Sequence, residues 1–262
     1  MKSAFFFTDI YWVFWREIKK FTQQRARILM LVIQPLVWLV LMGNSMSGLT
    51  RNPMAAKMLG TGNYLTFMTP GIMIMTALFG GVFGGTSIMW DRRLGFLNKM
   101  LAAPIHRAAI PLGKLLSIGL QTIMQALIIA CISLLLGVRF ITGIPGVIFL
   151  LLIAGLFGMI MASISLALAA NLKSIESLMA ISNFLTMPLM LTSNAMFPIS
   201  AMPSWLKVIA NVNPLSYAVS AMRTIATNGW YFNQIWLPVV MLITIALITI
   251  SVSIKMFYRS IS

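Results

Sequence analysis

Long apolar runs separated by short polar segments decide what this chain can fold into. A helix needs about 20 predominantly apolar residues to cross the hydrocarbon core of a bilayer. Several runs approach that length, and the predicted membrane spans are residues 28–49, 64–89, 110–136, 146–170, 178–197 and 235–254. Few residues remain between these spans for a soluble domain. We therefore expect one all-α integral membrane domain over residues 1–262, with six transmembrane helices.

Composition and charge agree with a membrane protein. The 262 residues are 60% hydrophobic and 9% charged, whereas a soluble domain carries about 25% charged residues. The net charge of +15 does not indicate a nucleic-acid partner, because Lys and Arg are spread over the short segments between the spans. We expect membrane lipids, and no nucleic acid, around this chain. The single cysteine, Cys131, excludes a disulfide within one chain.

Residues 1–27 are predicted to form an amphipathic helix that lies on the inner membrane surface. Ile10, Phe14, Ile18 and Phe21 recur at helical spacing, and basic side chains gather on the opposite side. No small-residue cleavage pattern follows the apolar residues at the beginning of the sequence. We therefore expect no cleaved signal peptide.

A charged segment, residues 90–107, interrupts the apolar pattern after the second predicted span. Leu94, Leu97 and Leu101 recur there at i, i+3 and i+7, which is typical of a short amphipathic helix, and Pro104 should end this helix. Two interpretations stay open from the residues alone. The segment is either a loop whose positive charges fix orientation, or a docking site for a cytosolic partner.

Polar side chains inside the spans cannot face lipid. In the third span Ser117, Gln121 and Gln125 lie on one helix face, where we expect hydrogen bonds to a neighbouring helix, with a substrate role as the alternative. The fifth span contains Asn183 and Asn194 among other polar residues, so it must face protein or a wet cavity. Between the fifth and sixth spans the apolar pieces are too short to cross a bilayer, which predicts short re-entrant or interfacial helices.

Glycines in the second span predict close approach of another helix. Gly80, Gly81, Gly84 and Gly85 form two overlapping pairs of small residues, each one helical turn apart. This pattern is compatible with tight packing inside one subunit and with a contact between two copies. The residues alone do not separate the two.

Charge also orients the chain. Most of the 19 Lys and Arg residues fall on the side that carries both predicted termini and residues 90–107. This places that side in the cytoplasm. All carboxylates and the single histidine fall in the same segments, and no ionisable side chain lies in the middle of a predicted span. Proton-driven transport is therefore poorly supported.

The sequence contains no residue pattern that indicates an enzyme. There is no Ser/His/Asp set, no pair of carboxylates at helical spacing and no cluster of metal ligands, so no catalytic residue and no metal is predicted. A phosphate loop is also absent, since Leu115 follows Gly113 and Lys114, and Ala108 stands where a glycine is required. Work against a gradient would need energy from another chain.

Short motifs stand in a fixed order around the spans. They are YLTFMTPG at 64–71, DRRLG at 91–95 with Leu97, Leu101 and Pro104, MFP at 196–198, MPSWL at 202–206, NPLSY at 213–217, and Arg223. In this order and spacing, the chain resembles the membrane subunits of ABC-2 type exporters, in the branch of daunorubicin-resistance and lipo-oligosaccharide permeases. The resemblance covers almost the whole chain.

This resemblance implies a partner and a coupling segment. In that family two permease chains pair with two copies of a separate ATP-hydrolysing subunit, and the segment after the second span is the coupling helix that docks on it. ATP and Mg²⁺ would bind to that partner, and this chain itself would hold no cofactor. The coupling residues implied are Asp91, Arg92, Arg93, Leu94, Gly95, Leu97, Leu101 and Pro104. This chain departs from the family pattern at Asn98, where an acidic residue is usual, and at Ala103, where Thr or Ser is frequent.

The resulting expectation is a permease subunit of an ATP-driven exporter in the plasma membrane of a prokaryote, with both termini cytoplasmic. It would pair with a second copy of itself or a near homologue and move a hydrophobic or amphipathic small molecule, drug-like or lipid-like. A transport path at the dimer interface would be lined by Phe67, Met75, Phe79, Asn183, Met187, Met190 and Asn194. The alternatives are export of a lipid-linked saccharide or lipo-oligosaccharide and, in another class, an energy-independent channel or scaffold subunit.

Overall fold

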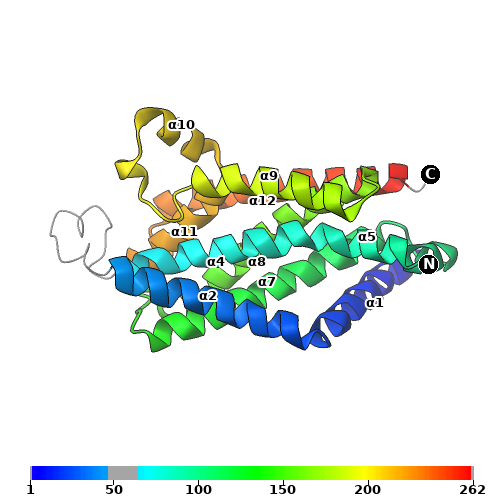
Figure 1. Ribbon diagram of the computed structural model, residues 1–262, viewed down its shortest axis with the longest axis horizontal. Coiled ribbons are helices and arrows are strands. Elements are labelled where there is room, and N and C mark those ends of the chain that lie inside the picture. The colour runs from blue at the N-terminus through cyan, green and yellow to red at the C-terminus, as the bar shows by residue number, and fades with distance from the viewer. Residues whose placement is uncertain (1, 47–63, 261–262) are drawn as a thin grey trace.

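The computed structural model describes residues 2–46 and 64–260, and every regular element in these ranges is a helix. Long helices run roughly side by side, with α1 (Lys2–Thr22) crossing one end of the bundle (Figure 1). Both termini lie at this end, together with α5 (Thr86–Arg93) and α6 (Phe96–Ala102). The all-α prediction is confirmed for the described residues.

Four of the predicted spans are helices long and apolar enough to cross a membrane. The first is the continuous 30-residue stretch Tyr64–Arg93, made of α4 (Tyr64–Val82), the 3-10 turn η2 (Phe83–Gly85) and α5. The other three are α7 (Ala109–Leu135), α8 (Gly143–Asn171) and α12 (Phe232–Ser260). These four helices make the chain a multi-pass membrane protein.

The fifth predicted span is shorter than expected, and the first is described only in part. α2 (Arg25–Met46) reaches the end of the first described range, and α9 (Ile175–Leu191) has 17 residues. At 1.5 Å per residue, α9 is about 26 Å long, slightly less than the bilayer core. The count of six spans therefore stays a prediction. Residues 47–63, which include the end of the first predicted span and the predicted external connection, lie outside the described residues.

The centre of the bundle is α8, which packs against α4, α7 and α12. Its large side chains, such as Phe157, Ile160 and Met161, are buried in one continuous cluster with Met73, Ile74 and Leu78 of α4. Apolar side chains surround α8 on several faces, as expected for a helix enclosed by other helices. This central packing sets the positions of the other elements.

The glycine-rich part of the second span is packed within one chain. A methyl group added to Gly81 would come within 2.5 Å of the Gly158 carbonyl oxygen, and one added to Gly84 would meet Ile118. Gly85 lies equally close to Ser165, whose hydroxyl donates to the Val82 carbonyl. Of the two interpretations of these glycines, the structure supports packing inside the subunit.

Short helices follow α9, as the sequence predicts. They are η3 (Ile199–Ala201), α10 (Ser204–Val212) and α11 (Pro214–Thr227). Asn213 caps α11 by accepting a hydrogen bond from the Leu215 amide, and Pro214 occupies the first helical turn, where a missing N–H costs nothing. α11 is buried against α4, α8 and α12, whereas α10 exposes Trp205, Val208 and Val212. Their depth in the membrane stays a prediction.

The close packing of α4 on α8 gives a stability prediction. Gly81→Ala should lower the unfolding temperature in detergent, because the added methyl group collides with the backbone of α8 and overpacking costs about 1–3 kcal/mol. Gly80→Ala is the matched control and should cost less, since its methyl group would meet side-chain atoms, Gln125 Oε1 at 3.1 Å and Thr122 Cγ2 at 3.3 Å, rather than backbone, and alanine favours the helix. Equal unfolding temperatures for the two variants would contradict this account.

Candidate functional site

The segment after the second span forms two helices. α5 continues the span to Arg93, the chain turns at Leu94 and Gly95, and α6 then runs from Phe96 to Ala102, just before Pro104. Gly95 has a φ of +72°, a left-handed conformation that glycine adopts without strain. The end of the helix before Pro104 is confirmed, but the prediction of one short helix through residues 94–101 is wrong.

This turn separates the three leucines of the predicted stripe. Leu94 is 63% exposed, whereas Leu97 is 3% exposed and Leu101 is partly buried. Leu97 belongs to a cluster with Ile110 of α7 and Phe257 of α12. Helical spacing does not hold across the turn at Gly95, so these side chains share no exposed face. The apolar residues that remain exposed here are Trp90, Leu94 and Phe96.

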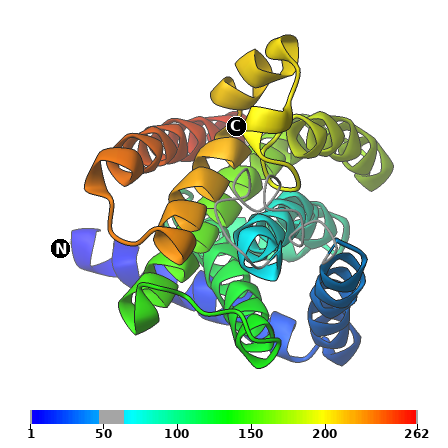
Figure 2. The same cartoon turned by 90° about the vertical axis from the view of Figure 1, so that its left-hand side faces the viewer.

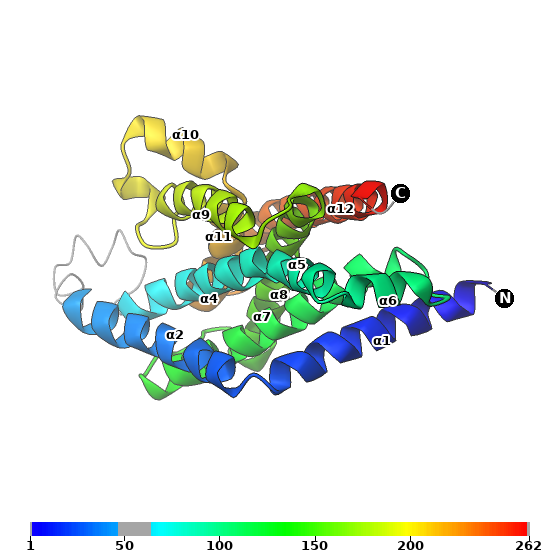
Figure 3. The same ribbon diagram turned by 45° about the vertical axis from the view of Figure 1, so that its right-hand side comes forward.

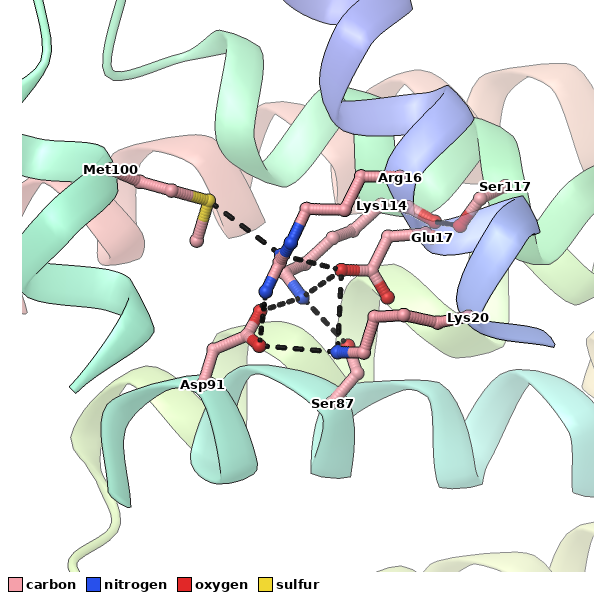
Figure 4. A network of polar contacts seen from close by, with 8 residues as sticks. All are labelled: Arg16, Glu17, Lys20, Ser87, Asp91, Met100, Lys114 and Ser117. Atoms are coloured by element: carbon pink, nitrogen blue, oxygen red, sulfur yellow. Dashed lines mark hydrogen bonds and ion pairs between the residues drawn. The ribbon is translucent and has the colours of Figure 1, made fainter. Parts of the chain in front are cut away.

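Asp91 points into the molecule, where it is 1% exposed. Its carboxylate accepts hydrogen bonds from Arg16 at 2.9 Å, Lys20 at 3.2 Å and Lys114 at 2.6 Å (Figure 4). Arg16 and Lys20 come from α1, and Lys114 comes from α7. Three helices distant in sequence are therefore joined through one carboxylate.

Lys114 is the most enclosed member of this group, with an exposed fraction of 0%. Its ammonium donates to Asp91, to Glu17 at 3.0 Å and to the Ser87 hydroxyl at 3.1 Å. An ammonium group has three N–H donors, and each has a partner here. Burial of the charge is tolerable because it is paired and fully hydrogen-bonded.

We call Arg16, Glu17, Lys20, Asp91 and Lys114 the ionic junction. Arg16 also donates to Glu17 at 3.0 Å, so both carboxylates contact more than one cation. The sequence interpretation assigned these cations to membrane orientation and Asp91 to docking, and it did not pair them. One signal was available, because Asp91 follows the second predicted span and Lys114 begins the third, so both lie at the same end of a helical hairpin.

Neighbouring basic residues have separate roles. Arg92 donates to the carbonyls of Ala170 and Leu172, both at 3.3 Å, and so caps the C-terminal end of α8. Arg93 lies over the Trp90 ring at 5.7 Å and is exposed. Of the predicted docking residues Asp91, Arg92 and Arg93, the last therefore presents its charge at the surface.

A second contact fixes the chain just after α6. The backbone amide of His106 donates to Asp9 at 3.0 Å, and the His106 ring nitrogen Nδ1 lies 2.8 Å from the same carboxylate oxygen. These hydrogen bonds, that of the backbone amide first, hold the pKa of Asp9 below its usual value. Together with the ionic junction, this contact attaches α1 to both sides of α6.

The remaining motifs meet at the opposite end of the bundle, around Arg223 of α11. Its guanidinium lies 3.7 Å from the Phe67 ring centroid and donates to the carbonyls of Phe67 at 3.2 Å, Asn194 at 3.1 Å and Ala195 at 3.3 Å. The sequence interpretation treated Arg223 as an orienting charge outside the membrane. The structure places it within the protein, where it holds the turn after α9 against α4.

Contacts at this end of the bundle explain two more motif positions, Gly71 and Asn213. A methyl group on Gly71 would collide with the Ala195 carbonyl oxygen, so α4 and the turn can approach only without a side chain. Asn213 donates to the Leu189 carbonyl at 2.8 Å and to the Thr192 hydroxyl at 3.0 Å. The polar residues that end the fifth predicted span thus bind protein, as predicted.

The predicted path residues do not meet in one chain. Phe67 and Asn194 are buried around Arg223, and Asn194 donates to Ser220 at 2.8 Å. Met75 and Met190 are partly buried, while Asn183 and Met187 are exposed on α9. Phe79 lines a cavity on the other side of α4. A path made of all seven residues would need a second copy.

The cavity that contains Phe79 has a volume of about 770 Å³ and lies between α1, α2, α4, α5 and α7. Ser117, Gln121 and Gln125 of α7 form part of its wall and are buried. Their burial agrees with the prediction that they face protein. The predicted hydrogen bonds to a neighbouring helix are not made by the Ser117 hydroxyl, which donates to the Lys114 carbonyl of its own helix, or by the Gln125 oxygen Oε1. Among the described residues, no group of three or more His, Cys, Asp or Glu side chains could hold a metal ion.

Residues 8–227 match the family model described as ABC-2 type transporter. The chain belongs to this family. It is therefore a membrane permease subunit of an ABC transporter, and the match covers the ionic junction, residues 90–107 and the Arg223 contacts in one domain.

Relatives from several lineages support the assignment. The chain is 34% identical over 205 residues to the transport permease ycf38 of Porphyra purpurea. This alignment covers 78% of this chain and 69% of the relative. It is 32% identical over 241 residues to ycf38 of Cyanophora paradoxa, covering 88% and 79%. It is also 26% identical over 219 residues to the daunorubicin resistance ABC transporter permease protein DrrB1 of Streptomyces coeruleorubidus, covering 83% and 75%. The last relative supports the predicted branch of the family.

The ionic junction gives the second prediction. Asp91→Asn leaves the buried Lys114 without one of its two carboxylates, and breaking a buried ion pair costs about 3–5 kcal/mol. We expect a lower unfolding temperature and faster proteolysis of α1. Glu176→Gln, at an exposed carboxylate in the first turn of α9, is the matched control and should change stability little. An Asp91→Asn protein as stable as the control would mean that the junction does not hold α1.

Proposed function

We propose that this ABC-2 permease is the membrane subunit of an ATP-driven exporter and that a separate ATPase subunit docks on the segment around α6. The observation that carries the proposal is that residues 90–103 contain both exposed side chains and side chains buried in the permease. Trp90, Leu94 and Phe96 are exposed, whereas Asp91 and Leu97 are buried in the permease. A partner that contacts the exposed side chains would act on a segment tied firmly to the membrane helices.

The contacts support a mechanical role for this segment. Force applied at α6 reaches α5 through the tight turn at Gly95, and reaches α1 and α7 through Asp91. Leu97 connects the same segment to α12 through Phe257. ATP hydrolysis on the partner would thus move several helices together rather than one loop. Leu101 packs α6 against the permease, and Pro104 follows the end of this helix.

ATP and Mg²⁺ are assigned to the partner subunit in this proposal. The Gly113-Lys114 dipeptide lies inside α7, and the Lys114 ammonium already donates to Asp91, Glu17 and Ser87. This lysine is therefore not available to a nucleotide phosphate.

The orientation that we propose for the chain in the membrane rests on the position of its termini. Both termini lie beside α5 and α6 (Figure 3), which supports a cytoplasmic location of the termini and of these two helices.

A single cysteine at Asn98, in a Cys131→Ala background, should react with an impermeant maleimide from the cytoplasmic face. Reaction from the outer face alone would reverse the orientation and end the docking proposal.

A hydrophobic or amphipathic small molecule is the cargo we propose, with movement out of the cytoplasm. Relatives named for daunorubicin resistance and, in Bacillus subtilis, for linearmycin resistance support this class of cargo. A lipid-linked saccharide is the alternative cargo. Membership of the ABC-2 type transporter family argues against the energy-independent channel or scaffold that the sequence alone left open.

A second copy would complete the transport path. Viewed along the helices, α2 and α9 stand on either side of α4 and border the same face of the bundle (Figure 2). Exposed on these helices are Ile33, Val37 and Leu41 of α2 and Asn183, Phe184 and Met187 of α9. We propose that this face meets its counterpart in a homodimer or a pair of near homologues.

The docking proposal predicts a specific loss of the partner. Leu94→Asp should fold and insert normally, because the side chain is exposed, but should bind the ATPase subunit roughly 10- to 100-fold more weakly, since burying one leucine contributes about 1.5–3 kcal/mol. The measurements are co-purification with the ATPase and cargo-stimulated ATP hydrolysis in vesicles.

Asn98→Asp is the matched control on the same segment. It adds the same charge at an exposed site of α6 where the family usually has an acidic residue, so docking should persist. Wild-type binding by Leu94→Asp would show that the exposed leucine is outside the interface.

A further inference from the structure

The cavity beside the ionic junction has the size and lining of a ligand site. Its volume of about 770 Å³ lies within the range of about 300–1,000 Å³ typical of small-molecule sites. Its lining residues come from α1, α2, the joint between them, α4, α5 and α7, the helices whose backbones can be followed in Figure 3. Trp90 and Leu94, which belong to the proposed docking surface, also line this cavity.

Uncharged polar groups dominate the polar part of the cavity wall. Amide and hydroxyl side chains come from α2, α4, α5, α7 and the α1–α2 joint: Gln24, Gln34, Thr76, Thr86, Ser87, Ser117, Gln121 and Gln125. Amides and hydroxyls both donate and accept hydrogen bonds. The hydroxyls of Thr76, Thr86 and Ser117 donate to carbonyls of the preceding helical turn and so offer their oxygens as acceptors, whereas glutamine amides supply donors as well. Together they complement a group that both donates and accepts, such as a sugar or polyol hydroxyl. Phe79, Phe83 and Trp90 add aromatic surface to the same wall.

Two charged residues line the cavity, and they have opposite signs. Lys20 lies 3.9 Å from Glu17 and also 3.2 Å from Asp91, and Glu17 is held at 3.0 Å by both Arg16 and Lys114. Each of the two charges at the wall thus has a partner within the protein. The wall therefore favours an uncharged ligand.

Gln125 supplies an independent sign of a missing donor. Its side chain is 5% exposed, it lines the cavity, and its carbonyl oxygen Oε1 is buried without a hydrogen-bond partner. A buried acceptor without a donor costs about 1–3 kcal/mol. A ligand hydroxyl that reached this oxygen would remove the cost.

We propose that this cavity binds the uncharged, hydroxyl-rich head of an amphipathic molecule, such as a glycosyl headgroup. The amides and hydroxyls of α4 and α7 bind the head, and the aromatic residues of α4 and α5 cover its apolar faces. The site belongs to one chain, so it requires neither the ATPase nor the dimer path.

The test uses the full chain in phosphatidylcholine nanodiscs without the ATPase subunit. The probe is a monoglycosyl diacylglycerol with a photoactivatable diazirine on the sugar, and the matched probe is a phosphatidylcholine with the diazirine on the choline. We expect the glycosyl probe to label peptides containing residues 76–90 and 117–125. Equal labelling by the choline probe, or glycosyl labelling elsewhere, would overturn the proposal.

Variants then test the chemistry. Gln125→Leu should weaken glycosyl labelling roughly five- to tenfold, the value of about one neutral hydrogen bond. Thr76→Val, a smaller change on the opposite wall, should also weaken it, so the proposal stays testable if Gln125→Leu misfolds. Gln234→Leu, an exposed glutamine of α12 outside the cavity, should label as wild type. Undiminished labelling of both cavity variants would contradict the site.

Competition identifies the source of the head. Displacement by unlabelled glycolipid but not by a soluble methyl glycoside would support a membrane lipid as the ligand. Displacement by both would support recognition of the hydroxyl-rich head alone. Displacement by neither would overturn specific binding. Because no ATPase is present, a negative result leaves the docking proposal untouched. The cavity variants Gln125→Leu and Thr76→Val lie outside residues 90–107, so their effects are separate from those of the docking variant Leu94→Asp, which also changes the cavity wall.

Discussion

Buried charge is the constraint on which the end of this permease that carries α1, α5 and α6 depends. Lys114 has no exposed surface, and a lone ammonium in such a place would be very unfavourable. Asp91, Glu17 and Ser87 satisfy it, and those partners exist together only when α1, α5 and α7 are docked. The same ion pairs therefore fix the position of α1 and the direction of α5. Because α6 follows α5 after a short turn, they also determine where the exposed residues of α6 lie.

A related arrangement holds the other end without any carboxylate. Arg223 donates to three backbone carbonyls and lies on the Phe67 ring, so it links α11, α4 and the turn after α9. Carbonyl oxygens at a turn and a helix end satisfy a guanidinium in a fixed geometry, because its donors are planar. The two ends are thus stiffened differently, and the glycine packing of α4 on α8 connects them.

Local patterns in the sequence predict much of this fold. Helical periodicity and apolar length identify α1, α4, α7, α8 and α12, and the polar face with Gln121 and Gln125 is correctly placed away from lipid. The leucine stripe fails because periodicity assumes an unbroken helix, and Gly95 breaks it with a turn. The ionic junction also escapes local analysis, since Arg16, Asp91 and Lys114 are far apart in sequence and meet only through tertiary packing. Whether the predicted path residues meet depends on a second copy, which no single-chain pattern specifies.

The central claim is that Asp91 and Lys114 act as one buried pair that joins α5, and with it the segment around α6, to the rest of the bundle. A double-mutant cycle with Asp91→Asn, Lys114→Gln and the double variant, followed by unfolding in detergent, measures their coupling directly. We predict that the double variant loses less stability than the sum of the single variants, by more than about 1 kcal/mol, because each single change leaves the other charge poorly compensated. Additive losses within about 0.5 kcal/mol, the behaviour of independent sites, would contradict the account.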